Sequence, residues 1–442
     1  MKITVIGGAG VRTPLLVSGL TASDLPIDEI ALYDVDRPRL AIIGPIAEQM
    51  ARTEGWRGRM RLCESPAEAI ASADFVFTSI RVGGLERRVR DEATAQRHGI
   101  VGQETIGPAG FAMATRTIPH MVRYAREIAA AAPRAWIVNF TNPVGMVTEA
   151  MRAETNRVIG ICDTPVELFE AAADALDLDA SRCFFDYFGL NHLGWLREIY
   201  SDGEPQLRRL WPDAARLQSI YKVPLFDSAS LRQLQLLPSE YVYYYDQPTR
   251  AFTNVRRAGR SRGQVIEELN RALFDALGDP ESDAARPEGR VERYRAYLLM
   301  RSGTYMQIEA GGHDPNAVSS ATATLGGYDR IAAAVVRAIH FNSHEIIPLS
   351  VVNHGALPDL RDGDVVEVPC VVDANGARAL HAGRVPEPVR PLLQQVKEYE
   401  RLTVRAALSQ SVDDARAALA ANPLVDGRAA ADALVDDLDP LW

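Results

Sequence analysis

Short apolar runs alternate with longer amphipathic stretches along the first part of the chain. The apolar runs have the length and composition of buried strands, and the stretches between them show helical spacing. This alternation predicts a parallel sheet whose strands are joined by right-handed crossovers. The expected strands cover residues 2–6, 30–34, 74–79, 135–140 and 158–162, and the expected helices open at 13 and cover 37–53 and 116–132.

The pattern changes beyond about residue 185, where aromatic-rich strands mix with long helices linked by an arginine-rich loop at 256–262. From Pro388 onward the tail is rich in alanine and leucine at helical spacing, which favours packing helices. We therefore predict two domains, a parallel-sheet α/β domain over 1–185 and an α+β domain over 186–442.

The composition of the chain limits the classes of ligand that we expect it to bind. The 442 residues carry a formal net charge of −10, which argues against broad binding to nucleic acid or to an anionic membrane. Any anionic ligand then needs a local basic pocket. We see no signal core and no stretch of transmembrane length, and we expect a cytoplasmic protein. The cysteines fit a reducing compartment because they lack zinc spacing and a dense disulfide pattern: Cys63, Cys162, Cys183 and Cys370.

A glycine-rich turn follows the first predicted strand. Gly7, Gly8 and Gly10 would let the backbone approach a pyrophosphate at a helix N-terminus, although Thr13 replaces the third glycine of the usual fingerprint. Asp34 ends the second strand, where a carboxylate accepts the ribose hydroxyls and repels a 2′-phosphate. The alternative is a solvated strand end. The pattern predicts a Rossmann-type domain that binds NAD in preference to NADP.

Four polar segments follow predicted strand ends and are hard to explain by packing. Ligands of open parallel sheets bind at the carboxyl ends of the strands, so these segments, with Cys162 and Asp163, are candidates for a site. Any one of them could instead be a network that stabilises a loop. The segments are Ile80–Gly84, Gly102–Thr105, Asn139–Pro143 and Asn191–Trp195.

With these segments and the stretch Val365–Cys370, the sequence resembles the family 4 glycoside hydrolases, particularly their 6-phospho-β-glucosidase branch. The likeness runs from the first strand to Val404. It implies hydrolysis of small phosphorylated glycosides with NAD and a divalent metal, usually manganese. NAD takes a hydride from C3, the metal polarises the ketone, and a side chain removes the C2 proton. The aglycone is eliminated, water adds, and the hydride returns.

The resemblance also implies roles for single residues. Cys162 and His192 match the metal ligands; without the resemblance they would be a buried cysteine and a satisfied histidine. The base is a tyrosine that best matches Tyr241, although Tyr243 to Tyr245 leave the register open. Hydroxyl-binding candidates are Asn142, Asn191 and Glu104, the last of which could also hold a metal-bound water. Candidates for a sugar 6-phosphate are Arg81, Arg88, Arg260 and Arg262, and Arg81 could also serve the cofactor.

Two departures from the family pattern leave specificity open. Val11 and Arg12 stand where many members carry serine or threonine and then tyrosine, which leaves a requirement for the phosphate open. Asp163 stands where β-specific members often have asparagine and α-specific members use an aspartate as general acid, which leaves the anomer open.

Two other functions remain to be separated from this one. The overall plan is similar to that of lactate and malate dehydrogenases, but we find no His-Asp relay in the second domain, and hydride transfer alone gives Cys162 and His192 no role. An NAD- or sugar-binding protein without catalysis is the other alternative. We expect a homodimer or a homotetramer, with the helical tail as a possible interface.

Overall fold

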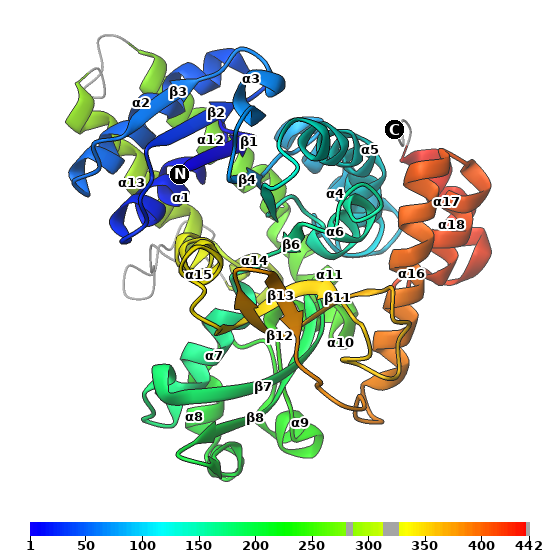
Figure 1. Ribbon diagram of the computed structural model, residues 1–442. Helices are drawn as coiled ribbons and strands as arrows, with labels where there is room; N and C mark the ends of the chain where they lie inside the picture. The colour runs from blue at the N-terminus through cyan, green and yellow to red at the C-terminus, as the bar shows by residue number, and fades with distance from the viewer. Residues whose placement is uncertain (280–285, 313–326, 439–442) are drawn as a thin grey trace.

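The computed structural model describes residues 1–279, 286–312 and 327–438. A nine-stranded sheet with the order β13-β12-β11-β6-β5-β4-β1-β2-β3 forms its centre (Figure 1). The six strands β1 to β6 pair in parallel, in the order of a Rossmann fold, which confirms the predicted fold class. They are β1 (Lys2–Ile6), β2 (Glu29–Tyr33), β3 (Arg59–Leu62), β4 (Phe75–Thr78), β5 (Trp136–Asn139) and β6 (Val158–Gly160).

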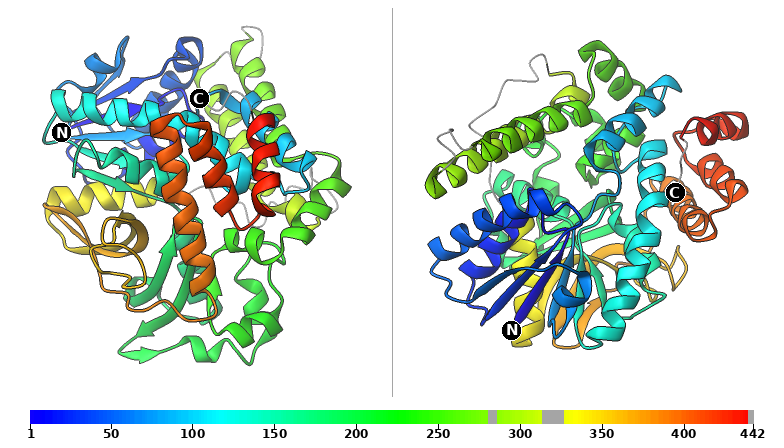
Figure 2. Two further views of the ribbon diagram at one scale, coloured as in Figure 1. Left: turned by 90° about the vertical axis from the view of Figure 1, so that its right-hand side faces the viewer. Right: turned by 90° about the horizontal axis from the view of Figure 1, so that it is seen from above.

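Helices cover both faces of this sheet. On one face α1 contacts α2 and α15, and on the other α5 contacts α3, α6 and α16 (Figures 1 and 2). The helices of the first half are α1 (Thr13–Ala22), α2 (Arg37–Thr53), α3 (Pro66–Ile70), α4 (Gly84–Arg97), α5 (Gly107–Ala131), α6 (Val144–Met151) and α7 (Thr164–Ala175).

Two elements differ from the prediction for physical reasons. Strand β3, which the sequence pattern missed, lies at the edge of the sheet, and its residues Arg59–Leu62 are half polar and partly exposed. Helix α5 begins at Gly107 rather than at residue 116, because its first turns are small residues that are buried on all sides and show no amphipathic period.

The second half of the chain completes the same sheet. Strand β11 (Glu345–Val352) pairs antiparallel with β6 at Ser350 and Gly160, and β12 (Val365–Asp373) and β13 (Gly376–Ala379) follow outward. A side chain at Gly160 would meet the Ser350 Cβ at 2.9 Å, so glycine permits this approach. A smaller sheet contains β7 (Cys183–Leu190), β8 (Leu193–Ser201), β9 (Glu204–Pro205) and β10 (Leu237–Pro238).

The remaining helices surround these two sheets. The predicted loop at 256–262 is shorter than expected, because residues 256–258 end α11 and a capping box of Ser261 and Gln264 starts α12 at Arg262. The short α-helices and 3-10 helices are η1 (Ala180–Arg182), η2 (Leu207–Arg209), α8 (Ala214–Ser219), α9 (Ser228–Leu234), η3 (Glu240–Val242), α10 (Tyr243–Asp246) and α14 (Gln307–Ala310). The longer ones are α11 (Pro248–Ala258), α12 (Arg262–Gly278), α13 (Pro287–Gly303) and α15 (Tyr328–Phe341).

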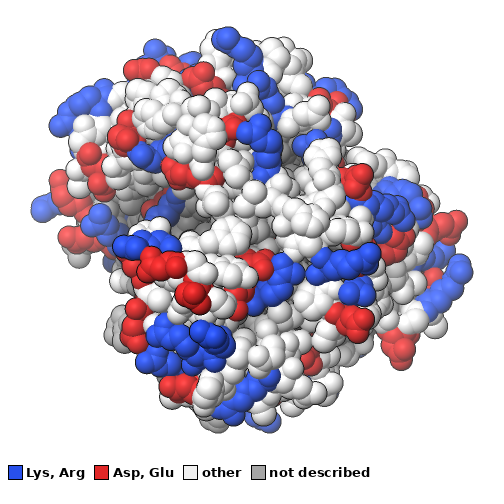
Figure 3. All heavy atoms as spheres, turned by 60° about the horizontal axis from the view of Figure 1, so that its bottom comes forward, with Lys and Arg blue, Asp and Glu red and all other residues white. Residues whose placement is uncertain are grey.

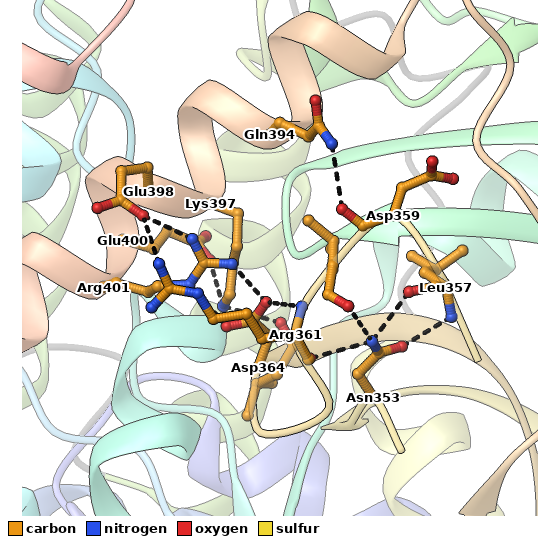
Figure 4. Close-up of polar contacts among 12 residues, drawn as sticks. Asn353, Leu357, Asp359, Arg361, Asp364, Gln394, Lys397, Glu398, Glu400 and Arg401 are labelled. Carbon is orange, nitrogen blue, oxygen red and sulfur yellow. Dashed lines mark hydrogen bonds and ion pairs between the residues drawn. The ribbon is translucent and has the colours of Figure 1, made fainter. Parts of the chain in front are cut away.

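The tail forms the predicted helices α16 (Arg390–Ser409), α17 (Val412–Ala421) and α18 (Gly427–Asp437), which stand side by side in Figure 2. Helix α16 is hydrogen-bonded to the loop between β11 and β12, because Asp364 of this loop accepts two hydrogen bonds from Arg401 (Figure 4). In the same loop the Asn353 side chain accepts from the Leu357 N–H at 2.7 Å and donates to three carbonyls. Within the described ranges no helix is long and apolar enough to cross a membrane.

Candidate active site

A cavity of about 780 Å³ lies at the carboxyl ends of the parallel strands. Its lining runs from the glycine turn after β1 to residues of the second half, so both halves of the chain build it. On the face shown in Figure 3, basic and acidic side chains are interspersed. Most of the residues that the sequence singled out meet in this cavity: Gly7, Gly10, Asp34, Arg81, Arg88, Glu104, Asn142, Cys162, Asp163, His192, Tyr241 and Arg262.

The glycine turn forms one end of the cavity. Gly7 has a φ of 95°, and a side chain there would meet the Ser79 carbonyl oxygen at 2.2 Å, so the turn requires glycine. Gly8 lies outside the lining and packs against β2, where its N–H donates to the Tyr33 carbonyl at 2.9 Å. Asp34 is tied to the turn because its Oδ2 accepts from the Ala9 N–H at 3.0 Å. Burial raises the pKa of Asp34.

Helices α12 and α13 reach this end of the cavity, which no motif predicted. The buried Tyr294 hydroxyl donates to the Val11 carbonyl of the turn at 2.7 Å. Phe274 lines the cavity near Arg39, whose guanidinium lies 4.8 Å from the centre of the Phe274 ring. Phe274 is the last of a stripe of cavity-lining residues spaced by four along α12: Arg262, Ile266, Asn270 and Phe274.

Cys162 and His192 line the same cavity. Cys162 follows β6 and is 7% exposed, whereas His192 occupies the turn between β7 and β8 with a φ of 63°. A positive φ at a residue other than glycine is strained and is common at functional sites. The His192 ring stacks on Tyr241 with ring centres 3.8 Å apart.

A chain of hydrogen bonds fixes the tautomer of His192. The side-chain oxygen of Gln103 accepts from both the N–H and the hydroxyl of Thr105, at 2.7 and 2.8 Å. Because that hydroxyl donates to Gln103, it accepts from His192 Nδ1, which lies 3.0 Å away. Nδ1 therefore carries the proton and Nε2 keeps a lone pair. Burial lowers the pKa of His192 to about 4, which keeps the ring neutral.

These two residues fit a divalent metal. The neutral imidazole already offers a free lone pair. Burial, with the nearby charges of Glu367 and Asp163, raises the pKa of the Cys162 thiol well above its usual range, and a bound cation would offset this. The described residues contain no group of three or more His, Cys, Asp or Glu side chains that could hold an ion.

Tyr241 is separated from its neighbours in the aromatic run. It lines the cavity, whereas Tyr243 and Tyr244 are buried outside it and Tyr245 packs against the main core. The run forms the helical turns η3 and α10 rather than a strand. Burial, with the charge of Glu240, raises the pKa of Tyr241 well above 10, so a base at neutral pH needs a cation beside it.

Arginines surround Glu104 on one wall of the cavity. Glu104 pairs with Arg81 and with Arg88, whose Nη1 lies 2.9 Å from Glu104 Oε2. Burial alone would raise the pKa of Glu104, but Arg81, Arg88 and Arg301 hold it well below its usual range. Burial lowers the pKa of Arg81 and of Arg262. Arg81, Arg88, Arg262 and Arg301 all line the cavity, and we call these four residues with Glu104 the arginine cluster.

Of the other residues predicted to bind substrate, one lines the cavity and two do not. Asn142 lines the cavity, and its buried Oδ1 has no hydrogen-bond partner among the described residues, so an acceptor is left for a ligand. Asn191 lies outside the lining and donates to Glu367 Oε1 at 3.1 Å. Arg260 also lies outside it, because it sits in the loop before α12 and pairs with the exposed Glu268.

Comparison with known proteins assigns the family. The model "Family 4 glycosyl hydrolase" matches residues 2–178, and the model of its C-terminal domain matches residues 187–425. The chain belongs to glycoside hydrolase family 4. A 6-phospho-beta-glucosidase of Escherichia coli (strain K12) is 30% identical, over 96% of this chain and 91% of the relative.

Solved structures of the family have the same fold. The 6-phospho-beta glucosidase of Thermotoga maritima, solved with NAD and glucose-6-phosphate, has a TM-score of 0.82 at 26% identity, over 99% of this chain and 97% of that one. A 6-phospho-alpha-glucosidase from gut microorganisms, solved with the same two ligands, has a TM-score of 0.81 at 27% identity, over 100% and 97%. A lactate dehydrogenase at 13% identity and a TM-score of 0.52 confirms the predicted likeness of fold.

Proposed function

We propose that this chain is a 6-phospho-β-glucosidase that depends on NAD and Mn²⁺ and cleaves by oxidation at C3, deprotonation at C2 and elimination. The observation that carries this proposal is the convergence of four features in one cavity. A dinucleotide turn, a Cys–His pair, a tyrosine stacked on that histidine and an arginine cluster all line it. A relative in the family was solved with manganese, NAD⁺ and glucose-6-phosphate.

When bound, NAD would supply a reversible hydride acceptor for C3, and the metal would supply a Lewis acid that acidifies the C2 hydrogen. The glycine turn and Asp34 would hold the cofactor, and Cys162 and His192 the metal. Tyr241 would take the C2 proton, and the free Oδ1 of Asn142 would accept from a sugar hydroxyl.

The arginine cluster supports a phosphorylated sugar. Arg81 and Arg88 both pair with Glu104, and neighbouring guanidinium groups disfavour one another's charge, as the effect of Arg88 and Arg301 on the pKa of Arg81 illustrates. A dianionic phosphate would relieve this repulsion and match the forked donors of arginine. The β anomer is proposed from the resemblance, and both α- and β-specific relatives are known in the family.

Turnover in heavy water tests the mechanism. Released sugar should carry deuterium at C2, with no net accumulation of NADH, and removal of NAD should abolish activity. Tyr241→Phe should slow this exchange by a factor of about a hundred or more if the tyrosine is the base. An NAD-free enzyme that releases sugar with its C2 hydrogen fully retained would contradict the proposal.

A panel of nitrophenyl glycosides tests the substrate. We expect activity on the 6-phospho-β-glucoside and little on the unphosphorylated or α-linked compounds. Equal rates with and without the phosphate would exclude the assigned role of the arginine cluster. Net NADH production with a hydroxy acid, and no glycoside cleavage, would instead indicate a dehydrogenase.

A further inference from the structure

A second, smaller cavity of about 130 Å³ adjoins the main one. The two share Tyr241, Asp163 and Arg12, and the small cavity adds Glu167, Lys222 and Glu240. If Tyr241 takes the proton from C2, the neighbouring C1 and its aglycone react beside a side chain that lines both cavities. The side cavity is therefore placed to receive the leaving group.

The carboxyl groups that line the side cavity differ in their partners. Glu167 pairs with Lys222 Nζ at 2.7 Å, and Asp163 pairs with Arg12 Nη1 at 3.2 Å. Glu240 forms no ion pair with any described residue and accepts a hydrogen bond from the Tyr305 hydroxyl. Two of these three neighbouring carboxyl groups are paired with a cation and one is not. The unpaired carboxyl group is the one that keeps its proton.

The wider surroundings of Glu240 agree with this. Burial, with the charge of Glu167, raises the pKa of Glu240 to about 7, and Asp163 acts in the same direction whereas Lys222 opposes it. Tyr221 also faces Glu240. Among the described residues, neither of the two other cations of this lining pairs with Glu240: Arg262 donates to the Thr304 carbonyl and hydroxyl, and Arg301 donates to the Tyr297 hydroxyl at 2.9 Å.

We propose that Glu240 is a general acid that protonates the aglycone oxygen in the side cavity. This inference rests on the proposed function. As Tyr241 takes the C2 proton, the C2–H electron pair forms the C1–C2 double bond, the C1–O bond breaks, and the departing oxygen receives the proton of Glu240. When water adds, its oxygen bonds to C1, Glu240 recovers a proton from that water, and the C2 proton returns from Tyr241. No oxidant is consumed.

Arg12 gives a reason for this division of roles. Asp163 is already paired with a cation, because Arg12 Nη1 lies 3.2 Å from its carboxylate. The Arg12 guanidinium also lies over the Tyr328 ring, 5.0 Å from its centre, so it is held on two sides. Glu240 is the carboxyl group of this cavity left in a position to donate.

A series of aryl 6-phospho-β-glucosides with leaving groups of different acidity tests the proposal. Glu240→Gln should keep nearly the wild-type rate on the dinitrophenyl compound, whose leaving group needs no proton. It should lose a factor of about 10²–10⁴ on the phenyl compound. The matched control is Glu268→Gln, a glutamate outside both cavities, which should change both rates by the same factor. Equal loss on both substrates in Glu240→Gln would overturn the proposal.

The wild-type enzyme gives an independent measurement. Because the acid must be protonated, kcat/KM for the phenyl compound should fall as the pH rises through about 7, and this limb should be absent for the dinitrophenyl compound. Identical profiles for both substrates would contradict a role for Glu240. Exchange of the C2 hydrogen should persist in Glu240→Gln, whereas its absence in the wild type would refute the proposed function itself.

Discussion

Two buried clusters of charged residues serve different purposes in this molecule. The tail cluster consists of Lys397 and Glu400 on α16 and Glu149 on α6. Arg401 and Asp364 lie beside Lys397 and Glu400 (Figure 4). Lys397 is fully buried, and its three donors reach Glu149 at 2.6 Å, Glu400 at 2.9 Å and the Val365 carbonyl at 3.0 Å. Its hydrogen-bonding capacity is therefore used up within the protein.

The arginine cluster is incomplete by comparison. Arg81 and Arg88 share Glu104, and Arg88 also pairs with the buried Glu92, while all four cations line a cavity rather than packed side chains. Burial lowers the pKa of Arg81, whereas the pKa of Lys397 is raised because Glu400 and Glu149 outweigh its burial. The comparison teaches that a buried charged group whose hydrogen-bond partners all lie within the protein stabilises the fold. A charged group that lines a cavity is available to a ligand.

The largest expected effect is a loss of turnover on substitution of a residue in the cavity. Cys162→Ser should abolish turnover and weaken Mn²⁺ binding, because the serine hydroxyl is a far poorer ligand than a thiolate. The free energy of unfolding should change little, since the substitution keeps the size of the side chain. Activity assays with manganese titration after chelation, together with urea denaturation, measure both quantities. Full activity at saturating manganese would remove Cys162 from the metal site.

The tail cluster should respond in the opposite way. Lys397→Met leaves Glu149 and Glu400 buried without their cation and should cost about 3–5 kcal/mol in the free energy of unfolding. The control is Lys222→Met, whose pair with Glu167 is partly exposed and should cost about 1 kcal/mol or less. Urea denaturation of both variants gives the comparison. Equal costs would show that burial does not separate the two ion pairs.

The sequence predicted those parts of the fold that have a local signature. The parallel strands were found because each is a short apolar run, whereas the polar edge strand β3 and the small-residue start of α5 lack the expected periods. The pairing of β11 with β6 joins Ser350 to Gly160 across a long stretch of chain, and no local pattern encodes such a contact. The predicted domain boundary at 185 therefore gave no sign that one sheet runs through both halves.

The same limit applies to the site. Residues at strand ends, such as Cys162 and Asp34, could be singled out because the carboxyl edge of a parallel sheet is a general place for ligands. Phe274 and Glu240, from a helix and a helical turn of the second half, line the two cavities, and Tyr294 bonds the glycine turn. Only the folded chain brings these residues to the strand ends. Tyr305 and Arg301 were missed for the same reason.

A smaller effect is expected from the hydrogen bonds behind His192. Thr105→Val removes the hydroxyl that accepts from Nδ1 and should weaken Mn²⁺ binding about 10–100-fold, because the ring loses its fixed tautomer and orientation. Thr105→Ser keeps the hydroxyl and serves as the control. Calorimetry with Mn²⁺ alone and with NAD alone separates a local effect from a general one. Unchanged manganese affinity in Thr105→Val would show that the chain from Gln103 does not act on the metal.

An effect of similar size concerns two arginines that the sequence could not tell apart. Arg260 and Arg262 are two positions apart, but Arg260 pairs with Glu268 outside the lining, whereas Arg262 begins α12 and lines the cavity. Arg262→Gln should raise KM for the phosphorylated substrate about 10–100-fold, the value of one charge-assisted hydrogen bond. It should leave binding of an unphosphorylated sugar nearly unchanged. Arg260→Gln should leave both values within about twofold, because an exposed ion pair contributes about 1 kcal/mol or less. Steady-state kinetics on the paired substrates measure the ratio, and a phosphate-specific loss in Arg260→Gln but not in Arg262→Gln would reverse the assignment.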